Sequence, residues 1–162
     1  MACARWQIHC PFTRISGGGI IIPIEEYKKI VAVLPILCVD VIIKNGKGEY
    51  LLIKRANEPL KDQWWVIGGR VLMGESLEQA AERKVKEEVG LEIDDVKSIG
   101  YYEDALETNP FGLATPLHSV SVVFSTSIDN KQRVTVDSQS SDWKYSNELP
   151  VKFFIKPFHG NL

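Results

Sequence analysis

Two adjacent carboxylates, Glu87 and Glu88, stand near the end of a stretch with helical periodicity in this chain of 162 residues. Neighbouring carboxylates at one end of a helix can hold a hard cation through oxygen, and Mg²⁺ in proteins is usually shared with substrate phosphates. Arg83 precedes Glu87 by four residues, the spacing at which opposite charges meet on a helix. These residue types therefore indicate metal-assisted chemistry at a phosphate-bearing ligand.

The helix that positions these residues is predicted to run from about Ser76 to Val89. Ser76 is a favourable N-cap, and Gly90 stands where a residue with positive φ commonly ends a helix. A rotation of about 100° per residue also places Lys84 and Glu88 on the buried stripe of this helix. The apolar members of that stripe are Leu77, Ala80, Ala81, Val85 and Val89.

Charged side chains on the buried side of a helix are costly unless they are paired or bind a metal. Two interpretations of Lys84 and Glu88 follow from this. In the first, the two residues form an (i, i+4) salt bridge at the rim of the core. In the second, Glu88 is a metal ligand. Helix geometry alone favours neither interpretation.

A longer pattern surrounds the helix and favours the metal-binding interpretation. It has the spacing Gly-x5-Glu-x7-Arg-x3-Glu-Glu-x-Gly-Leu and consists of Gly69, Glu75, Arg83, Glu87, Glu88, Gly90 and Leu91. This pattern resembles the signature of the Nudix hydrolases, which bind magnesium and cleave nucleoside diphosphates linked to another group. The resemblance implies an α/β fold, a Nudix-type α/β/α sandwich with a mixed sheet and a loop–helix–loop catalytic motif.

The resemblance covers most of residues 24–150 and is strongest to one branch of the family, the GDP-mannose mannosyl hydrolases. The matching segments are Glu25-Glu26-Tyr27, Val39-Asp40, the run from Gly48 to Arg55 and the run from Trp64 to Val71. The resemblance implies Mg²⁺ as the cofactor, with Mn²⁺ as a substitute, and a nucleoside diphosphate sugar as the substrate. It also implies a homodimer formed through the N-terminal segment.

The resemblance assigns roles to individual residues of this chain. The metal ligands it implies are Glu87, Glu88, Gln139 and the backbone carbonyl of Gly69 or its neighbour Gly68. Arg55 and Arg70 would contact the diphosphate, where a guanidinium stabilises the charge of the leaving group, and Asp40 would help to recognise the substrate. Arg83 would orient the glutamates. The catalytic residues are thus expected to be Arg70, Arg83, Glu87 and Glu88.

The chain departs from the family pattern at two positions. Lys84 stands where the family normally has a further glutamate of the metal site, so a site for several metal ions is not expected. Ser140 stands where the branch has a histidine general base directly after the glutamine ligand, and a hydroxyl is not a base at neutral pH without help. Four residues are candidates to replace that base: Glu75, His118, Asp137 and Asp142.

Three functions remain open from the sequence. In the first, water attacks the sugar carbon and the nucleoside diphosphate leaves, as in the mannosyl hydrolase branch. In the second, water attacks phosphorus, as a pyrophosphohydrolase acting on a nucleoside diphosphate derivative would do. In the third, the domain binds a nucleotide sugar without turnover, which the combination of Lys84 and Ser140 suggests.

Composition excludes other classes of protein. Nineteen basic and twenty-one acidic residues give a net charge of −2, which provides no general positive field for nucleic acid. The longest apolar run, Ile30 to Val39, contains Pro35 and is too short to cross a bilayer of roughly 30 Å. No secretory signal is apparent, so a cytoplasmic protein is expected. The three cysteines lack the spacing of a zinc site, and Cys38 is predicted to lie in the core.

One domain is predicted over residues 23–162, after a tail of residues 1–22 without assigned structure. A helix is expected from residue 24 to about residue 33, followed by a hairpin of strands 35–44 and 49–55 around a polar turn. A short apolar segment, residues 64–67, is expected to stop at Gly68-Gly69, and one of Trp64 and Trp65 to pack in the core. Further strands are predicted at 96–106, 117–128 and 143–145, and the type of segment 147–158 is ambiguous.

Overall fold

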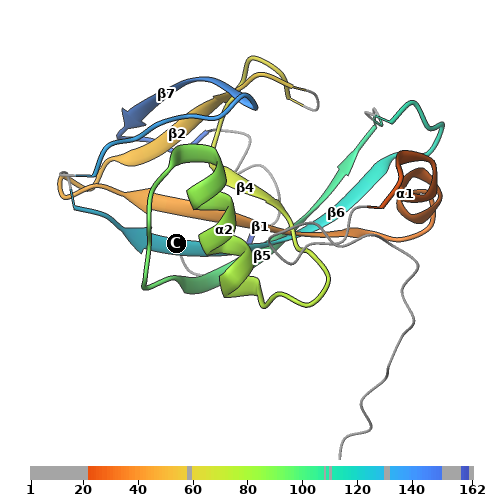
Figure 1. Cartoon of the computed structure of the whole chain (residues 1–162), viewed down its shortest axis with the longest axis horizontal. Coiled ribbons are helices and arrows are strands. Elements are labelled where there is room, and N and C mark those ends of the chain that lie inside the picture. Colours follow the sequence, from red (N-terminus) through yellow and green to blue (C-terminus); the bar gives the residue numbers. More distant parts are fainter. Residues whose placement is uncertain are drawn as a thin grey trace, which may run out of the picture.

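The sheet is built around two parallel strands, β1 (Ile36–Lys44) and β6 (Leu117–Ser127), which pair along the whole length of β1. The computed structural model describes residues 22–57, 60–107, 109, 111–129, 132–150 and 158–160. Within these residues eight strands form one mixed sheet, because the remaining strand pairs are antiparallel (Figure 1). The other strands are β2 (Tyr50–Arg55), β3 (Trp64–Trp65), β4 (Ile67–Arg70), β5 (Lys97–Leu106), β7 (Ser140–Ser146) and β8 (Phe158–Gly160).

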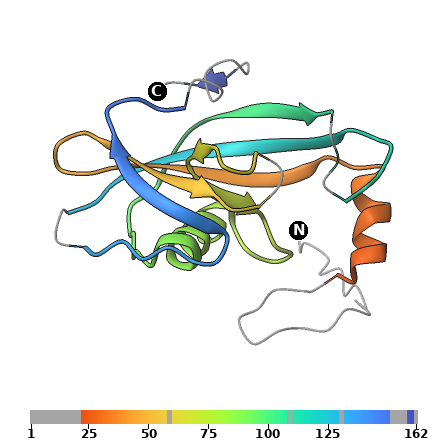
Figure 2. The same ribbon diagram turned by 90° about the horizontal axis from the view of Figure 1, so that it is seen from above.

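Two helices lie at different places on this sheet. Helix α2 (Leu77–Val89) lies across one face, whereas α1 (Ile24–Val31) lies at the end of the sheet where β1 begins (Figures 1 and 2). The expected mixed α/β fold is therefore confirmed. Neither helix in the described part of the chain is long and apolar enough to cross a membrane.

Helix α2 begins and ends where the sequence predicts. The Ser76 hydroxyl accepts a hydrogen bond from the backbone N–H of Gln79 at 3.2 Å, and the Gln79 side chain accepts one from the Ser76 N–H at 2.9 Å. Gly90 follows the helix with φ of 68°. This reciprocal cap and left-handed terminus fix the ends of the helix that carries the charged residues.

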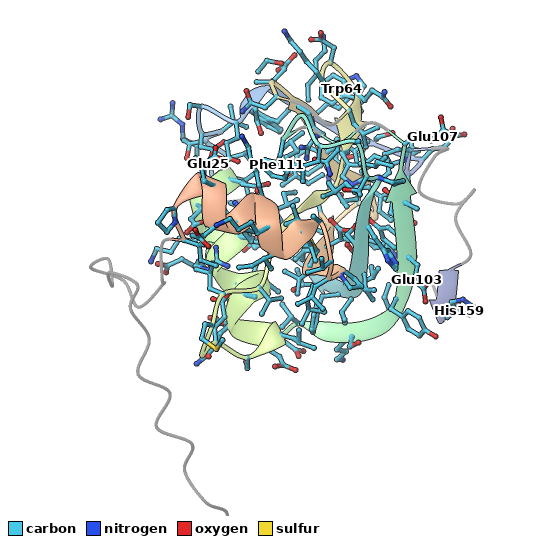
Figure 3. The ribbon with its side chains drawn as sticks, turned by 90° about the vertical axis from the view of Figure 1, so that its right-hand side faces the viewer. Glu25, Trp64, Glu103, Glu107, Phe111 and His159 are labelled. Atoms are coloured by element: carbon cyan, nitrogen blue, oxygen red, sulfur yellow. The ribbon has the colours of Figure 1, made fainter. Side chains whose placement is uncertain are left out.

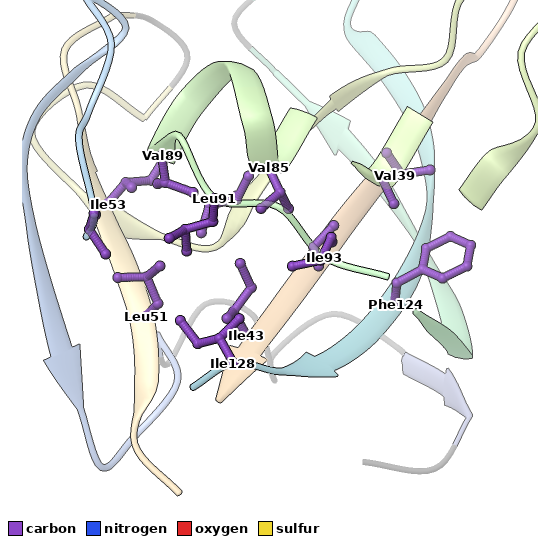
Figure 4. Close-up of a cluster of buried hydrophobic side chains, with 14 of the residues drawn as sticks. Val39, Ile43, Leu51, Ile53, Val85, Val89, Leu91, Ile93, Phe124 and Ile128 are labelled. Atoms are coloured by element: carbon purple, nitrogen blue, oxygen red, sulfur yellow. The ribbon is translucent and has the colours of Figure 1, made fainter. Parts of the chain in front are cut away.

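The apolar stripe of α2 packs on the central strands to form the main core (Figure 4). Ala80, Ala81, Val85 and Val89 are fully buried, as predicted, whereas Leu77 is only partly buried. Their partners on the sheet and on the segment after α2 include Val39, Ile43, Leu51, Ile53, Leu91 and Phe124. This packing fixes the rotation of α2, and with it the directions in which Lys84 and Glu88 point.

Strands β1 and β2 form the predicted hairpin, but they pair only next to the turn, at Lys44 and Tyr50. Farther along, β4 pairs with β1 from Val41 to Cys38, while β2 pairs with β3 and β7. The two strands of the hairpin thus separate, and β4 pairs with the edge of β1 that β2 leaves open, beside α2.

The prediction that a strand stops at Gly68-Gly69 is wrong. The apolar segment divides after Trp65, and β4 continues through both glycines to Arg70. Gly68 and Gly69 are required because neighbouring atoms leave no room for a Cβ, not because the chain reverses there. A Cβ on Gly68 would overlap Asp40 and the backbone of Val39, and one on Gly69 would lie 2.7 Å from the Lys84 Cε.

The remaining boundaries agree closely with the sequence, with two exceptions. Helix α1 ends at Val31, about two residues early, and β7 extends over Ser140–Ser146 because it pairs along β2. Residues 1–21 of the predicted tail and residues 151–157 of the ambiguous segment lie outside the described residues.

The end of α2 provides a test of this packing. Gly48 and Gly90 both have positive φ, but a Cβ on Gly48 meets nothing within 4 Å, whereas one on Gly90 would overlap the Thr135 hydroxyl. We expect Gly48→Ala to lower the free energy of unfolding by about 1 kcal/mol, the cost of the left-handed backbone, and Gly90→Ala to lower it by clearly more. Urea unfolding measures both, and equal losses would contradict the assigned contact.

Candidate active site

Alternate residues of three neighbouring strands build the floor of a cleft of about 490 Å³. Asp40 of β1 lines this cleft, while its neighbours Val39 and Val41 belong to the core beneath α2. Successive side chains of a strand point to opposite faces of a sheet, so β5 and β6 present every second residue to the same cleft. The result is a row of polar groups: Cys38, Asp40, Tyr102, Asp104, Ser119 and Ser121.

The cleft extends to the place where β4 lies beside α2. Gly68, Gly69, Lys84 and Glu88 line this part. The structure brings six of the residues predicted for the site to the cleft: Asp40, Arg55, Gly69, Arg70, Glu88 and Gln139. Arg83 and Glu87, the other two, are not among its lining residues.

Lys84 and Glu88 form the salt bridge that was one of the two interpretations of the sequence. The Lys84 Nζ lies 2.7 Å from the Glu88 Oε1 and 3.4 Å from the Glu87 Oε2. Lys84 is 7% exposed and Glu88 is 5% exposed. Burial raises the pKa of Glu88, and the ammonium of Lys84 and the backbone N–H of Gly68 oppose that rise.

The implied metal ligands do not fit a divalent cation in this arrangement. Glu88 already binds an ammonium, and Glu87 is half exposed and binds Arg83. Across the described residues, no three acidic, histidine or cysteine side chains gather as a metal site would need. Unit charges about 4 Å apart interact by about 4 kcal/mol at an effective dielectric constant near 20, and a divalent ion beside an ammonium doubles that repulsion.

Arg83 connects the loop before α2 to the helix. Its guanidinium donates to both carboxylate oxygens of Glu75, at 2.9 and 2.7 Å, and to the backbone carbonyl of Arg70 at 3.0 Å. It also reaches Glu87 at 3.1 Å, the contact that the helical spacing predicts. The main partner is nevertheless Glu75, so Arg83 chiefly fixes the loop that carries Arg70.

A buried hydrogen bond joins Asp40 to Tyr102, a cleft residue that the sequence analysis did not identify. The Tyr102 hydroxyl donates to the Asp40 carboxylate, and burial, followed by the nearby Asp40 charge, strongly raises the pKa of Tyr102. The alternation of Tyr102 with Asp104 along its strand was the signal that could have found it.

Cys38 also lines this cleft, so the expectation that it lies in the core is corrected. It stands two residues before Asp40 on β1 and therefore points to the same face of the sheet. Burial, together with the Asp40 charge, raises the pKa of the Cys38 thiol to about 12. The thiol is therefore neutral near pH 7.

Two aromatic rings contributed by α1 and a later loop lie beside Arg70. The Arg70 Cζ lies 4.5 Å from the centre of the Tyr27 ring, and the Phe111 ring meets Tyr27 edge-on at 5.2 Å. Figure 3 shows Phe111 against α1. Tyr27, Arg70 and Phe111 all line the cleft, so α1 takes part in the site.

One tryptophan of the pair is buried, as predicted, although both contact the same apolar cluster. Trp65 is 6% exposed, belongs to a second apolar cluster and lines the cleft. Trp64 is half-buried and makes a cation–π contact with the Lys144 ammonium, which lies 4.3 Å from the ring centre. The tryptophan that packs in the core is thus also the one that faces the cleft.

Ser140 lines the cleft, but the four candidates to replace the missing base do not. The Ser140 Oγ is buried and has no hydrogen-bond partner within the described part of the chain. Glu75 is bound to Arg83, Asp137 holds the amide of Gln139, and Asp142 accepts from the backbone of its neighbour. His118 is exposed on β6. None of these four lines the cleft.

Comparisons with known proteins define the class of this fold and site. Residues 34–156 match the model of the NUDIX domain. The low-salt glycan biosynthesis protein Agl8 of Haloferax volcanii is 31% identical over 160 residues, covering 99% of this chain and 92% of that protein. An ADP-ribose pyrophosphatase of Methanocaldococcus jannaschii is 35% identical over 121 residues, covering 74% and 68%.

A solved structure agrees with the fold. The NUDIX domain of Shewanella oneidensis NrtR, crystallised with ADP ribose, aligns with a TM-score of 0.58 at 20% identity, covering 83% of this chain and 87% of that one. The mixed sheet with its loop–helix–loop thus has the fold of a NUDIX domain. The chain belongs to the Nudix family, whose members generally use divalent metals such as Mg²⁺.

The contact between Glu75 and Arg83 makes stability depend on pH. Arg83, as hydrogen-bond donor, lowers the pKa of Glu75 below its ordinary value of 4.5. A carboxylate with a lowered pKa stabilises the fold above the unfolded value and loses that effect as the pH falls through the folded value. We expect Glu75→Gln to lower the free energy of unfolding by about 1–3 kcal/mol at pH 7 and by much less near pH 3.

Urea unfolding at both pH values measures this difference. Glu82→Gln, on the exposed face of α2, is the control and should change stability little at either pH. A loss for Glu75→Gln that is independent of pH would contradict the ionic role of this residue.

Proposed function

We propose that the cleft binds a nucleoside diphosphate sugar and hydrolyses it, with GDP-mannose as the first candidate substrate. The observation that carries this proposal is the gathering of three cationic side chains, Arg55, Arg70 and Lys84, along one cleft of a chain whose net charge is −2. Guanidinium and ammonium donors of this kind suit the oxygen atoms of a compact diphosphate. The relative named as an ADP-ribose pyrophosphatase supports the substrate class, since ADP-ribose is itself a nucleoside diphosphate joined to a sugar.

The two arginines would hold the diphosphate. Arg55 comes from the end of β2 and Arg70 from the end of β4, so each stands where a strand leaves the sheet. Planar guanidinium groups donate two parallel hydrogen bonds to a phosphate and stabilise the charge that develops on a leaving diphosphate. Trp65, Tyr27 and Phe111 supply the apolar lining that a base or sugar would contact.

In the reaction that we favour, water attacks the sugar carbon. A bond forms between the water oxygen and that carbon, and the bond from the carbon to the diphosphate oxygen breaks. Its electron pair leaves on the nucleoside diphosphate, and a proton of the water passes to a carboxylate of the cleft. We assign this proton to Asp40, because Glu88 is neutralised by Lys84 and Tyr102 fixes the Asp40 carboxylate in place.

Two other functions have specific support. In the first, water attacks phosphorus and gives a nucleoside monophosphate and a sugar phosphate. This reaction is favoured by Glu87, a glutamate of the family signature that lies in the last turn of α2 and binds Arg83. Binding without turnover is favoured by the neutral pair of Lys84 and Glu88, which leaves no carboxylate there free to activate water.

Hydrolysis of GDP-mannose in water enriched in oxygen-18 separates the three functions. We expect the label in the released sugar, because carbon attack transfers the water oxygen to that carbon. Mass spectrometry of both products gives the position of the label. Label in a phosphate would support attack on phosphorus, and binding without turnover would leave the domain as a nucleotide-sugar binder.

Asp40→Asn tests the proton-accepting group. The change keeps the size of the side chain and an acceptor for Tyr102 but removes the base, so kcat should fall by about 10²–10⁴ with little change in KM. Asp142→Asn, exposed and outside the cleft, should retain the activity of the unmodified chain. A rise in KM alone would mean that Asp40 recognises substrate, and equal rates would remove it from the reaction.

A further inference from the structure

We infer that the ammonium of Lys84 takes the place of the divalent cation of the family and binds the diphosphate directly, so that this cleft holds its ligand without a metal. The inference rests on the proposed function for the class of ligand. The geometric evidence for it does not depend on that function, because it comes from the surroundings of the Lys84 side chain.

The ammonium of Lys84 lies beside the acidic residues of the signature. Lys84 Nζ lies between two carboxylates that the signature would give to a metal, 2.7 Å from Glu88 and 3.4 Å from Glu87. Its side chain is only 9% exposed, yet Lys84 lines the cleft. An ammonium carries three N–H donors, and among the described residues these two carboxylates accept two of them. The third donor is available to an oxygen of a ligand.

Strand β4 leaves space for this lysine. A Cβ on Gly69 would lie 2.7 Å from the Cε, 3.2 Å from the Cδ and 3.4 Å from the Nζ of Lys84. The aliphatic part of Lys84 therefore passes directly over the backbone of Gly69. The backbone φ of Gly69 is not in the left-handed region, so its small size serves the lysine rather than a turn.

The charge next to Lys84 also disfavours a metal ion. Lys84 and Glu88 together are neutral, and the cleft is further lined by Arg55 and Arg70 and by Asp40 and Asp104. A divalent ion at the position that the signature implies would lie next to an ammonium that is shielded from water. The ammonium therefore occupies the place of a cation between these two carboxylates.

Binding of Mn²⁺ alone tests the replacement without any nucleotide. Electron paramagnetic resonance of free Mn²⁺ would be followed during titration of the full chain and of two charge-reversal variants. We expect Lys84→Glu, which restores a third carboxylate beside Glu87 and Glu88, to bind Mn²⁺ about 10-fold or more tightly than the unmodified chain. Lys86→Glu, which makes the same change at an exposed position of the same helix, should behave like the unmodified chain.

Equal affinity of Mn²⁺ for the unmodified chain and Lys84→Glu would overturn the inference. Three carboxylates in one place repel one another, so the melting temperature of each protein would be measured with and without Mn²⁺. Selective stabilisation of Lys84→Glu by Mn²⁺ supports the inference even if that variant is unstable without metal. Stabilisation of the unmodified chain to the same extent contradicts it.

A second experiment uses GDP-mannose as the probe, with tryptophan fluorescence as the signal and either EDTA or Mg²⁺ in the buffer. The unmodified chain should bind with the same affinity in both buffers, and Lys84→Gln should bind about 10-fold more weakly in EDTA. Loss of binding by the unmodified chain in EDTA would overturn the inference. Absence of binding in both buffers would contradict the proposed function instead, and the Mn²⁺ titration would still decide the role of Lys84.

Discussion

The separation of β1 from β2 is the constraint on which the rest of the site depends. A hairpin that stayed paired along its length would close the edge of β1, whereas this one opens after a single pair and lets β4 occupy that edge. Because β4 carries Gly68 and Gly69 at the point of entry, α2 can approach with two charged residues facing inward. The cleft, the buried ion pair and the position of Arg70 all follow from this one change of strand partners.

Periodicity predicted the elements of the fold well because it reports burial directly. The stripe of α2, including the inward placement of Lys84 and Glu88, followed from helical rotation alone. The partners of the strands could not be predicted in this way. Gly68-Gly69 was predicted to end the strand because glycine often marks a turn. These positions instead require glycine because a Cβ there would collide with Asp40 or Lys84, which are distant in the sequence.

The difficulty of predicting contacts between distant residues also explains which site residues were missed. Residues within the signature were identified by spacing, and six of the predicted site residues line one cleft. Tyr102 was not predicted as a site residue because its partner Asp40 lies 62 positions away in the sequence. None of the four candidates for the missing base lines the cleft. Spacing alone does not reveal the partners of a side chain, and Glu75 and Asp137 have structural contacts of their own.

The stacking of Arg70 on Tyr27 gives α1 a part in recognition, although this helix brings no charged group into the cleft. An aromatic ring covers the flat face of a guanidinium and leaves its N–H edge open, so the same arginine can stack and donate at once. Arg83 meanwhile donates to the backbone carbonyl of Arg70 and holds the main chain at that residue. Arg70 is thus oriented before any ligand arrives, and the entropy of ordering its long side chain is lost on folding rather than on binding.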